Sequence, residues 1–196
     1  MKHALILANP KPRSFSRMMA DAYADAATAA GHEVVLRDLY ALGFDPRLMA
    51  DEVPTEPSAQ PRPDALAERE ALQDADVFVF VYPIWFGGPP AILKGYVERV
   101  FGQGFGYRSV KAGGMEPLLR GKKLISFTST GSENAWLVDS GGWDAVRKVF
   151  DQRIAQACGL QALDHVNFGG VDNDLPPARV DEAREGVKRV FNEVFG

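Results

Sequence analysis

The chain has 196 residues, 46% of them hydrophobic and 24% charged, which suits one globular domain with a substantial core. The formal net charge is −4 and the lysines and arginines are spread along the chain, which argues against a nucleic-acid-binding protein. A lone cysteine, Cys158, excludes an internal disulfide and fits a reducing compartment. With no signal-peptide layout and no apolar run of membrane-spanning length, we expect a cytoplasmic protein that is not an integral membrane protein.

The first part of the chain predicts two short strands and one helix before an irregular stretch. The apolar run Ala4–Ala8 predicts a buried strand, and the alanine-rich segment 17–30, followed by Gly31, predicts a helix. The valine-rich segment 33–36 predicts a second strand. Segment 54–63 holds four prolines, but the α/β pattern resumes directly after it. We therefore expect a long surface connection there, not a linker between domains.

The strongest signal lies in the middle of the chain. Asp64 is the expected N-cap of a helix at 64–74. The run Val77–Tyr82 is apolar without polar alternation, which predicts a strand buried on both faces of a parallel sheet. The pair Pro89–Pro90 suits the first turn of the next helix, where a missing backbone N–H costs nothing. The loop at 83–88 should then lie at the carboxyl end of a central strand, where open α/β sheets bind ligands.

The second half predicts two more strands and two more helices. Segment 102–121 is rich in glycine and aromatic residues but has too little periodicity for a regular element. The expected elements after it are a strand at 122–129, a helix at 143–157 broken by Gly159, a strand at 161–168 and a helix at 177–194. This alternation predicts a single α/β domain, residues 1–196. We expect a doubly wound, five-stranded parallel sheet in the flavodoxin-like order 2-1-3-4-5.

The loop after the first predicted strand is the best candidate for an anion site. It lies at a helix N-terminus, where free N–H groups and the helix dipole favour a phosphate. A Ser-x-Ser taken alone is more often a simple N-cap, but its position after the first strand of a wound sheet favours phosphate binding. The candidate residues are Asn9, Ser14, Phe15 and Ser16, with Lys11 and Arg13 adding positive charge nearby.

Two further loops complete a candidate site for a planar ligand. One offers a stiff apolar wall with a glycine that lets a ring approach the backbone. The other offers hydroxyl and backbone N–H groups for the polar edge of a heterocycle, although its composition is also common in turns. The wall residues are Pro83, Ile84, Trp85, Phe86 and Gly87, and the polar-edge residues are Thr128, Ser129, Thr130 and Gly131.

Other motifs predict no chemistry of their own. The G-x-G-x-G run at 102–106 follows a helix instead of opening one, so we interpret it as a mobile glycine-rich lid and not as a nucleotide fingerprint. His3, His32 and His165 follow no ligand spacing and are expected at strand ends or on the surface, so we expect no metal site. With no Ser/His/Asp set or P-loop either, the pattern favours a protein that orients a cofactor, which does the chemistry.

A long, specific motif is formed by W-F-G-G at 85–88, P-A-I-L-K-G at 90–95 and E-R-V-F at 98–101. Together with S-F-S at 14–16 and D-L-Y at 38–40, these segments resemble the flavodoxin-like NAD(P)H:quinone oxidoreductases over most of the chain. The resemblance implies a flavin with its phosphate or pyrophosphate on Asn9 and 14–16. It also implies a flavin ring against 83–87 and a pyrimidine edge near 128–131.

The reaction implied by the resemblance is hydride transfer from NADH or NADPH to flavin N5. Two-electron reduction of a quinone, or of another small aromatic acceptor, follows in the same pocket. Tyr107 and Trp136 are the implied catalytic residues and form, with Phe105, a roof over the pocket. Family members are usually homodimers with the site at the subunit interface, so some of these residues are expected to serve the other subunit's flavin.

The chain also departs from its well-studied relatives. Asn9 stands where they have His, and a gapless alignment puts Trp136 and Gly142 where they have Tyr and His. The Glu98–Arg99 match leans towards FAD, whereas the short connection at 54–63 keeps FMN open. The alternatives to a quinone reductase are a flavin-dependent azo or nitro reductase, a flavin-bearing regulatory partner of a membrane transporter and a one-electron flavodoxin carrier.

Overall fold

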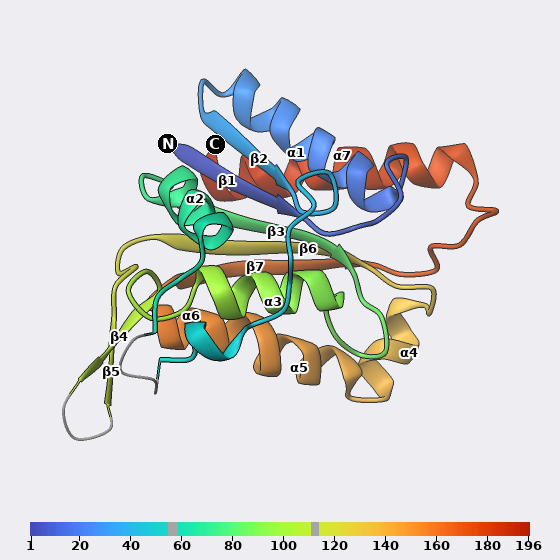
Figure 1. The fold of residues 1–196 in the computed structure, drawn as a ribbon. Coiled ribbons are helices and arrows are strands. Elements are labelled where there is room, and N and C mark those ends of the chain that lie inside the picture. The colour runs from blue at the N-terminus through green and yellow to red at the C-terminus, as the bar shows by residue number, and fades with distance from the viewer. Residues whose placement is uncertain (55–58, 111–113) are drawn as a thin grey trace.

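The computed structural model describes residues 1–54, 59–110 and 114–196 (Figure 1). Parallel strands form the central sheet in the order β2-β1-β3-β6-β7. The strand bounds are Lys2–Leu7 (β1), Glu33–Asp38 (β2), Val77–Pro83 (β3), Lys123–Ser129 (β6) and Gln161–Phe168 (β7). The predicted α/β class and the flavodoxin-like 2-1-3-4-5 order are confirmed.

Helices cover both faces of this sheet (Figure 1). One face carries α1 and α7, which lie side by side, and the other carries α2, α3 and the α5–α6 segment. The helix bounds are Phe15–Ala29 (α1), Pro63–Leu72 (α2), Ala91–Val100 (α3), Asn134–Asp139 (α4), Gly142–Val146 (α5), Gln152–Cys158 (α6) and Pro177–Phe195 (α7). A 3₁₀ turn, Ala50–Glu52, precedes α2, and a π-helical turn, Arg147–Asp151, joins α5 to α6.

Strand β3 is the centre of the core. All of its residues are buried. The valines at 77, 79 and 81 join the hydrophobic cluster beneath α1 and α7, whereas the aromatic residues at 78, 80 and 82 join the cluster beneath α3 and α6. A strand with apolar residues on both sides needs cover on both sides, as the sequence pattern predicted.

Part of the long motif has a structural role in α3. A Cβ atom at Gly95 would lie 2.0 Å from the carbonyl oxygen of Pro46, so only glycine allows the segment before α2 to cross this helix. One turn later, buried Arg99 pairs with Glu52 and Asp64. The expected N-cap role of Asp64 is therefore wrong, because the N-cap of α2 is Arg62 and the Asp64 carboxylate holds Arg99.

Two predictions for the second half need correction. Segment 102–121 contains a small antiparallel hairpin, β4 (Tyr107–Val110) and β5 (Gly114–Pro117), where no regular element was expected. The loop expected before the helix at 143–157 includes α4, and that helix is divided by the π-helical turn. Gly159 ends α6, as the sequence predicted, and the structure shows that it does so in the left-handed conformation, with φ 77°.

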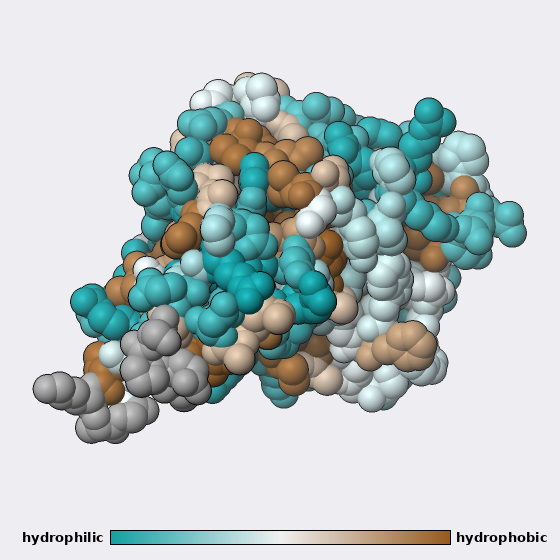
Figure 2. All heavy atoms as spheres, in the orientation of Figure 1, coloured by the Kyte–Doolittle hydropathy of each residue, from teal (hydrophilic) through white to brown (hydrophobic). Residues whose placement is uncertain are grey.

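The surface is mixed in character. On the face seen in Figure 2, hydrophilic residues divide the hydrophobic ones into small groups. Exposed large apolar side chains include Trp85, Phe86 and Trp136, which follow the carboxyl ends of β3 and β6. Of the helices in the described ranges, none combines the length and apolar composition needed to cross a bilayer.

Candidate functional site

The structure brings the three predicted loops to one edge of the sheet, the carboxyl edge (Figure 1). Strands β1, β3 and β6 are direct neighbours, so the loops that follow them are neighbours as well. Backbone hydrogen bonds hold the strand ends together, from Ala8 N to Val81 O at 3.0 Å and from Ile84 N to Ser129 O at 2.8 Å. The three candidate loops therefore begin side by side at this edge.

The first loop ends in the N-cap of α1. Ser14 Oγ accepts from Arg17 N at 3.1 Å, and Asn9 Nδ2 donates to Ser16 Oγ at 3.1 Å. Ser16 is buried, so it supports the loop from within, whereas Ser14 is half-buried and retains a hydroxyl hydrogen to donate. The first turn of α1 carries no acidic residue. Its positive dipole end is thus open to an anion.

The second loop is a tight turn that presents an aromatic side chain. Trp85 and Gly88 exchange two backbone hydrogen bonds, at 2.9 and 3.1 Å. Between them, Phe86 and Gly87 have φ of 49° and 75°, a combination typical of a type I′ turn. Among the described residues, Phe86 is the non-glycine residue with positive φ, and its side chain is fully exposed.

Local strain at an exposed aromatic residue is a feature of ligand-binding turns, because the surrounding fold must hold it there. A Cβ atom at Gly87 would meet no heavy atom within 4 Å, so the backbone is open to a ring at this position. Pro83 and Ile84 differ from the expected wall, since both are buried in the core. The exposed apolar surface of this loop comes from Trp85 and Phe86.

The third loop is less available than its composition implies. The Thr130 hydroxyl donates to Ser132 O at 2.9 Å, and Thr128 Oγ1 lies 2.9 Å from Asn167 Oδ1. Both threonines are buried, as is Ser129, so the expected row of free hydroxyl groups is not present. Gly131 is exposed, and a Cβ atom there would lie 3.9 Å from Val171 O. This loop therefore offers an open backbone supported by a closed side-chain network.

Tyr107 and Trp136 lie at opposite ends of the sheet. Trp136 is 61% exposed on α4, just after the carboxyl end of β6. Tyr107 begins the hairpin that leads to the amino end of the same strand. A strand of seven residues separates the two ends, or ~20 Å at ~3.3 Å per residue. The expected roof of Phe105, Tyr107 and Trp136 is therefore not formed within one chain.

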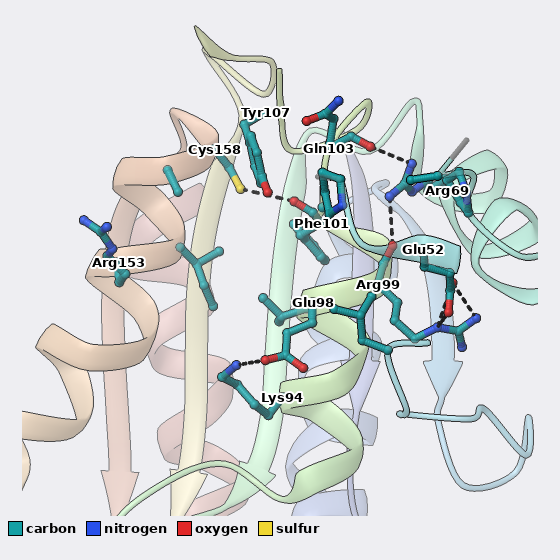
Figure 3. A pocket seen from close by; sticks show the side chains of 18 of the residues that line it. Glu52, Arg69, Lys94, Glu98, Arg99, Phe101, Gln103, Tyr107, Arg153 and Cys158 are labelled. Carbon is teal, nitrogen blue, oxygen red and sulfur yellow. Dashed lines mark hydrogen bonds and ion pairs between the residues drawn. The ribbon is translucent and has the colours of Figure 1, made fainter. Parts of the chain in front are cut away.

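Tyr107 instead lines a cavity of about 720 Å³ between α3, α6 and the hairpin (Figure 3). The guanidinium of Arg69 donates to the backbone carbonyls of Arg99, Val100 and Gln103, which ties down the start of the glycine-rich run. A Cβ atom at Gly106 would lie 2.1 Å from Phe101 O. The interpretation of this run as a mobile lid is wrong for its packed part, where glycine serves close packing.

One of the three histidines is not where the sequence predicted. His165 is buried inside strand β7, whereas His3 lies near the start of β1, as expected for a strand-end residue, and is buried as well. His3 bonds Tyr23 Oη at 2.8 Å and His32 Nδ1 at 3.0 Å. Burial, with His32 and other nearby positive charges, lowers the pKa of His3 to about 4. In the described ranges, no group of three His, Cys, Asp or Glu residues has the arrangement of a metal site.

Sequence reasoning missed the pairing of His165 with Asp151. His165 Nε2 lies 3.0 Å from Thr128 Oγ1, and Nδ1 pairs with Asp151 Oδ2. The sequence showed only that Asp151 lies in the helix predicted at 143–157 and that His165 lies in the strand predicted at 161–168. The separation of fourteen positions gave no periodicity to connect them, and the π-helical turn alters the helical register at Asp151.

The sequence matches the family model described as "Flavodoxin-like fold" over residues 1–191. It is 30% identical to "NAD(P)H dehydrogenase [quinone] 1" of Rattus norvegicus, over 97% of this chain and 76% of that protein. In fold, it matches the "NAD(P)H:quinone oxidoreductase from Methanothermobacter marburgensis" with a TM-score of 0.85 and 24% identity, over 97% of this chain and 94% of that one.

A second fold match is an "FMN-dependent NADH-azoreductase from Bacillus anthracis str. Ames Ancestor in complex with FMN". Its TM-score is 0.75 at 15% identity, and the match covers 100% of this chain and 99% of that one. The resemblance inferred from the long motif is confirmed by the family model and by the rat relative. The chain belongs to the flavodoxin-like fold family and, within it, to the flavodoxin-like NAD(P)H:quinone oxidoreductases.

Proposed function

We propose that this protein is a flavin-dependent oxidoreductase that passes two electrons from NADH or NADPH to a quinone. The observation that carries the proposal is the carboxyl edge, where a helix N-terminus free of acidic residues and an exposed aromatic turn follow neighbouring strands. A flavin bound at this edge would supply the two-electron redox chemistry. The protein binds and orients the reactants.

The residues at this edge fit a flavin in two ways. Ser14 and the first backbone N–H groups of α1 would hold its phosphate, while Asn9 and buried Ser16 keep the loop in shape. Trp85, Phe86 and the open backbone at Gly87 would hold the ring system. The pyrimidine edge would then face the open backbone at 129–131. Each part uses a group that the fold leaves accessible.

We propose FMN in preference to FAD. The Glu98–Arg99 motif, which favoured FAD in the sequence, gives no support for FAD within this chain. Arg99 is buried and forms ion pairs with Glu52 and Asp64. Glu98 pairs with Lys94 along the exposed side of α3. The FMN of the azoreductase neighbour supports the smaller flavin. Mass spectrometry of the cofactor released by denaturation distinguishes the two, and a mass of FAD would contradict this assignment.

We also propose that two copies share each site. Tyr107 lies at the amino edge of its own chain, so it reaches a flavin at a carboxyl edge only from a second copy. Two inactive variants, Tyr107→Ala and Gly87→Leu, test this arrangement. Mixed after partial unfolding and refolding, they should form heterodimers in which one of the two sites is intact, and activity should return. No return of activity in a proven heterodimer would contradict the shared site.

The central experiment is an anaerobic redox cycle. The purified protein, loaded with FMN, should show the absorption of an oxidised flavin, lose it on addition of NADH or NADPH, and regain it on addition of a quinone. Protein that binds no flavin at saturating concentration, or whose flavin is not reduced by either nicotinamide, would contradict the proposal. The same protein incubated with free riboflavin, which has no phosphate, tests the role of the α1 N-terminus.

An azo compound is the second candidate acceptor. The azoreductase neighbour has the same fold over the whole chain, and the aromatic turn of Trp85 and Phe86 does not distinguish a flat quinone from a flat azo dye. Comparing kcat/KM for a benzoquinone, a naphthoquinone and an azo dye under one set of conditions decides between them. A higher value for the azo dye would reassign the acceptor while leaving the flavin site as proposed.

A further inference from the structure

A buried hydrogen-bond network lies directly beneath the third loop. At its inner end, Asp151 accepts from Ser126 Oγ at 3.0 Å and pairs its second oxygen with His165 Nδ1. The other ring nitrogen, His165 Nε2, lies 3.0 Å from Thr128 Oγ1. All four residues are buried. Because these groups are shielded from water, each must find its hydrogen-bond partner within the network. The direction of each hydrogen bond then follows from groups that can only donate or only accept.

The outer end of the network sets this direction. The carbonyl of Ser132 can only accept, so Thr130 donates its hydroxyl hydrogen there, at 2.9 Å. Thr130 Oγ1 must then accept from Asn167 Nδ2, at 3.0 Å. Asn134 Oδ1 accepts from the same nitrogen at 2.7 Å, while Asn134 Nδ2 donates to the Asn167 carbonyl. Two independent neighbours thus orient the Asn167 amide, with its oxygen towards Thr128.

This orientation determines the protonation of His165. Asn167 Oδ1 accepts from Thr128 at 2.9 Å, which uses the single hydrogen of that hydroxyl. Thr128 can then only accept from His165, so Nε2 carries a proton. On the other side of the ring, Nδ1 faces Asp151 Oδ2, and a charged pair leaves both carboxylate oxygens as acceptors, one for Nδ1 and one for Ser126. We infer that Nδ1 carries a proton as well and that His165 is an imidazolium.

The resulting ion pair points towards the carboxyl edge. The carboxylate of Asp151 is bound at Ser126, whereas the ring of His165 reaches Thr128, two residues nearer the end of β6. Two strand residues span ~6.6 Å. The positive end of the pair thus lies towards the third loop and the negative end lies away from it. In a buried setting such a fixed dipole acts on nearby charge with little screening.

We propose that His165 is a positioning residue that raises the reduction potential of the bound flavin. The inference rests on the proposed function, with the pyrimidine edge of the flavin at 129–131. Reduction would place negative charge on that edge, and a fixed positive group nearby stabilises this charge. His165 acts through Thr128 and Asn167, which also hold Thr130 and hence the shape of the loop.

Other groups around the ring do not replace its charge. The ring of Tyr82, from β3, lies 6.2 Å away, and Trp143, from α5, packs edge-on at 4.7 Å. Arg147 lies over the Trp143 ring at 5.7 Å, so its guanidinium interacts with the indole. Asp164 accepts from the backbone N–H of His165 at 2.7 Å and belongs to the same strand. Loss of the imidazolium therefore changes the charge of this network directly.

The protonation itself can be tested without flavin. In the unsubstituted protein labelled with ¹⁵N-histidine, NMR at neutral pH should show one imidazole with both ring nitrogens protonated, assigned by its loss in His165→Gln. His3 and His32 serve as internal references. A His165 signal with one unprotonated nitrogen would overturn the proposal, whatever the cofactor. This measurement remains decisive if the glutamine variant does not fold, because selective labelling and the other two histidine variants identify the signal.

The effect on the flavin is tested by redox titration of the loaded protein. His165→Gln keeps a hydrogen-bond donor for Thr128 but removes the charge, so the equilibrium constant for two-electron reduction should fall at least about tenfold, or about 30 mV. His32→Gln, at the amino edge, is the matched control and should leave the potential unchanged. An unchanged potential in folded, flavin-loaded His165→Gln would overturn the redox role. Failure of the parent protein to bind any flavin would instead overturn the proposed function.

Discussion

The two edges of the same sheet are built on different principles. At the carboxyl edge, polar and aromatic groups are left accessible, and a non-glycine residue, Phe86, is held at positive φ. Towards the amino edge, charged side chains are paired with other groups of the same chain. Arg99 is 3% exposed and donates hydrogen bonds to Glu52, Asp64 and a backbone carbonyl. The guanidinium of Arg69 donates to three backbone carbonyls.

The difference shows why charge alone does not mark a functional site. The heavily paired side chains of Arg99 and Arg69 belong to the amino edge, where they hold neighbouring segments of the chain together. The carboxyl edge has weaker local interactions but open backbone and exposed rings, which are available to a ligand. If this division is correct, substitutions in the closed network of Arg99 should change stability, and substitutions in the carboxyl-edge loops should change binding.

The largest expected effect is on stability, from Arg99→Leu. The change leaves the buried carboxylate of Glu52 without its partner, and we expect a loss of ~3–5 kcal/mol in the free energy of unfolding. Urea denaturation followed by circular dichroism measures it. The control is Arg47→Leu, whose pair with Asp45 is exposed and should leave stability nearly unchanged. A small effect at Arg99 would mean that the closed network is not what holds the segment before α2.

A binding effect is expected from Gly87→Leu at the other edge. The new Cβ meets no atom of the protein within 4 Å, so the fold should survive with modest strain from the positive φ, whereas a ring can no longer approach the backbone. Affinity for FMN should fall at least about tenfold, equal to about 1.4 kcal/mol. Gly31→Leu, with φ 78° and equally open space, controls for backbone strain. Equal FMN affinity in the two variants would contradict the flavin site.

Much of the carboxyl edge could be predicted from the sequence, because its signals are local. The unbroken apolar run of β3 located a central strand, and position in a wound sheet then placed the loop at 83–88 and the Ser14 turn at one edge. The distribution of exposure within the loops could not be predicted in the same way. Ile84, Thr128 and Thr130 turn inwards, since their burial depends on partners such as Asn167 and the β6 strand end.

The amino edge and the network beneath the third loop were beyond local pattern. Arg99 meets Glu52 and Asp64 across separations of 47 and 35 positions, and His165 meets Asp151 through an irregular helical turn. Neither pairing produces a periodic pattern in the sequence. The β4–β5 hairpin was missed because its strands are short and mostly exposed, so they lack the alternation of a half-buried strand.

A pH effect is expected at the amino edge from His3. Burial lowers the pKa of His3 to about 4, whereas its ordinary pKa is near 6.5. Between these two pH values, His3 is protonated in the unfolded chain but not in the folded chain. Stability should therefore be fully present above the ordinary value and fall as the pH drops through this window. The midpoint of urea denaturation at pH 7 and pH 5 measures it. His3→Gln should reduce this dependence, and an undiminished slope would assign it to other groups.

The smallest expected effect concerns Cys158, which faces the cavity beside Tyr107. Burial raises the pKa of its thiol to about 11, so at neutral pH the folded protein holds almost no thiolate. Alkylation by iodoacetamide should be much slower than in urea-unfolded protein, where the thiol has an ordinary pKa near 8.5. Cys158→Ala should keep the activity of the loaded enzyme. Fast alkylation of the folded protein that also stopped turnover would contradict the structural role of Cys158.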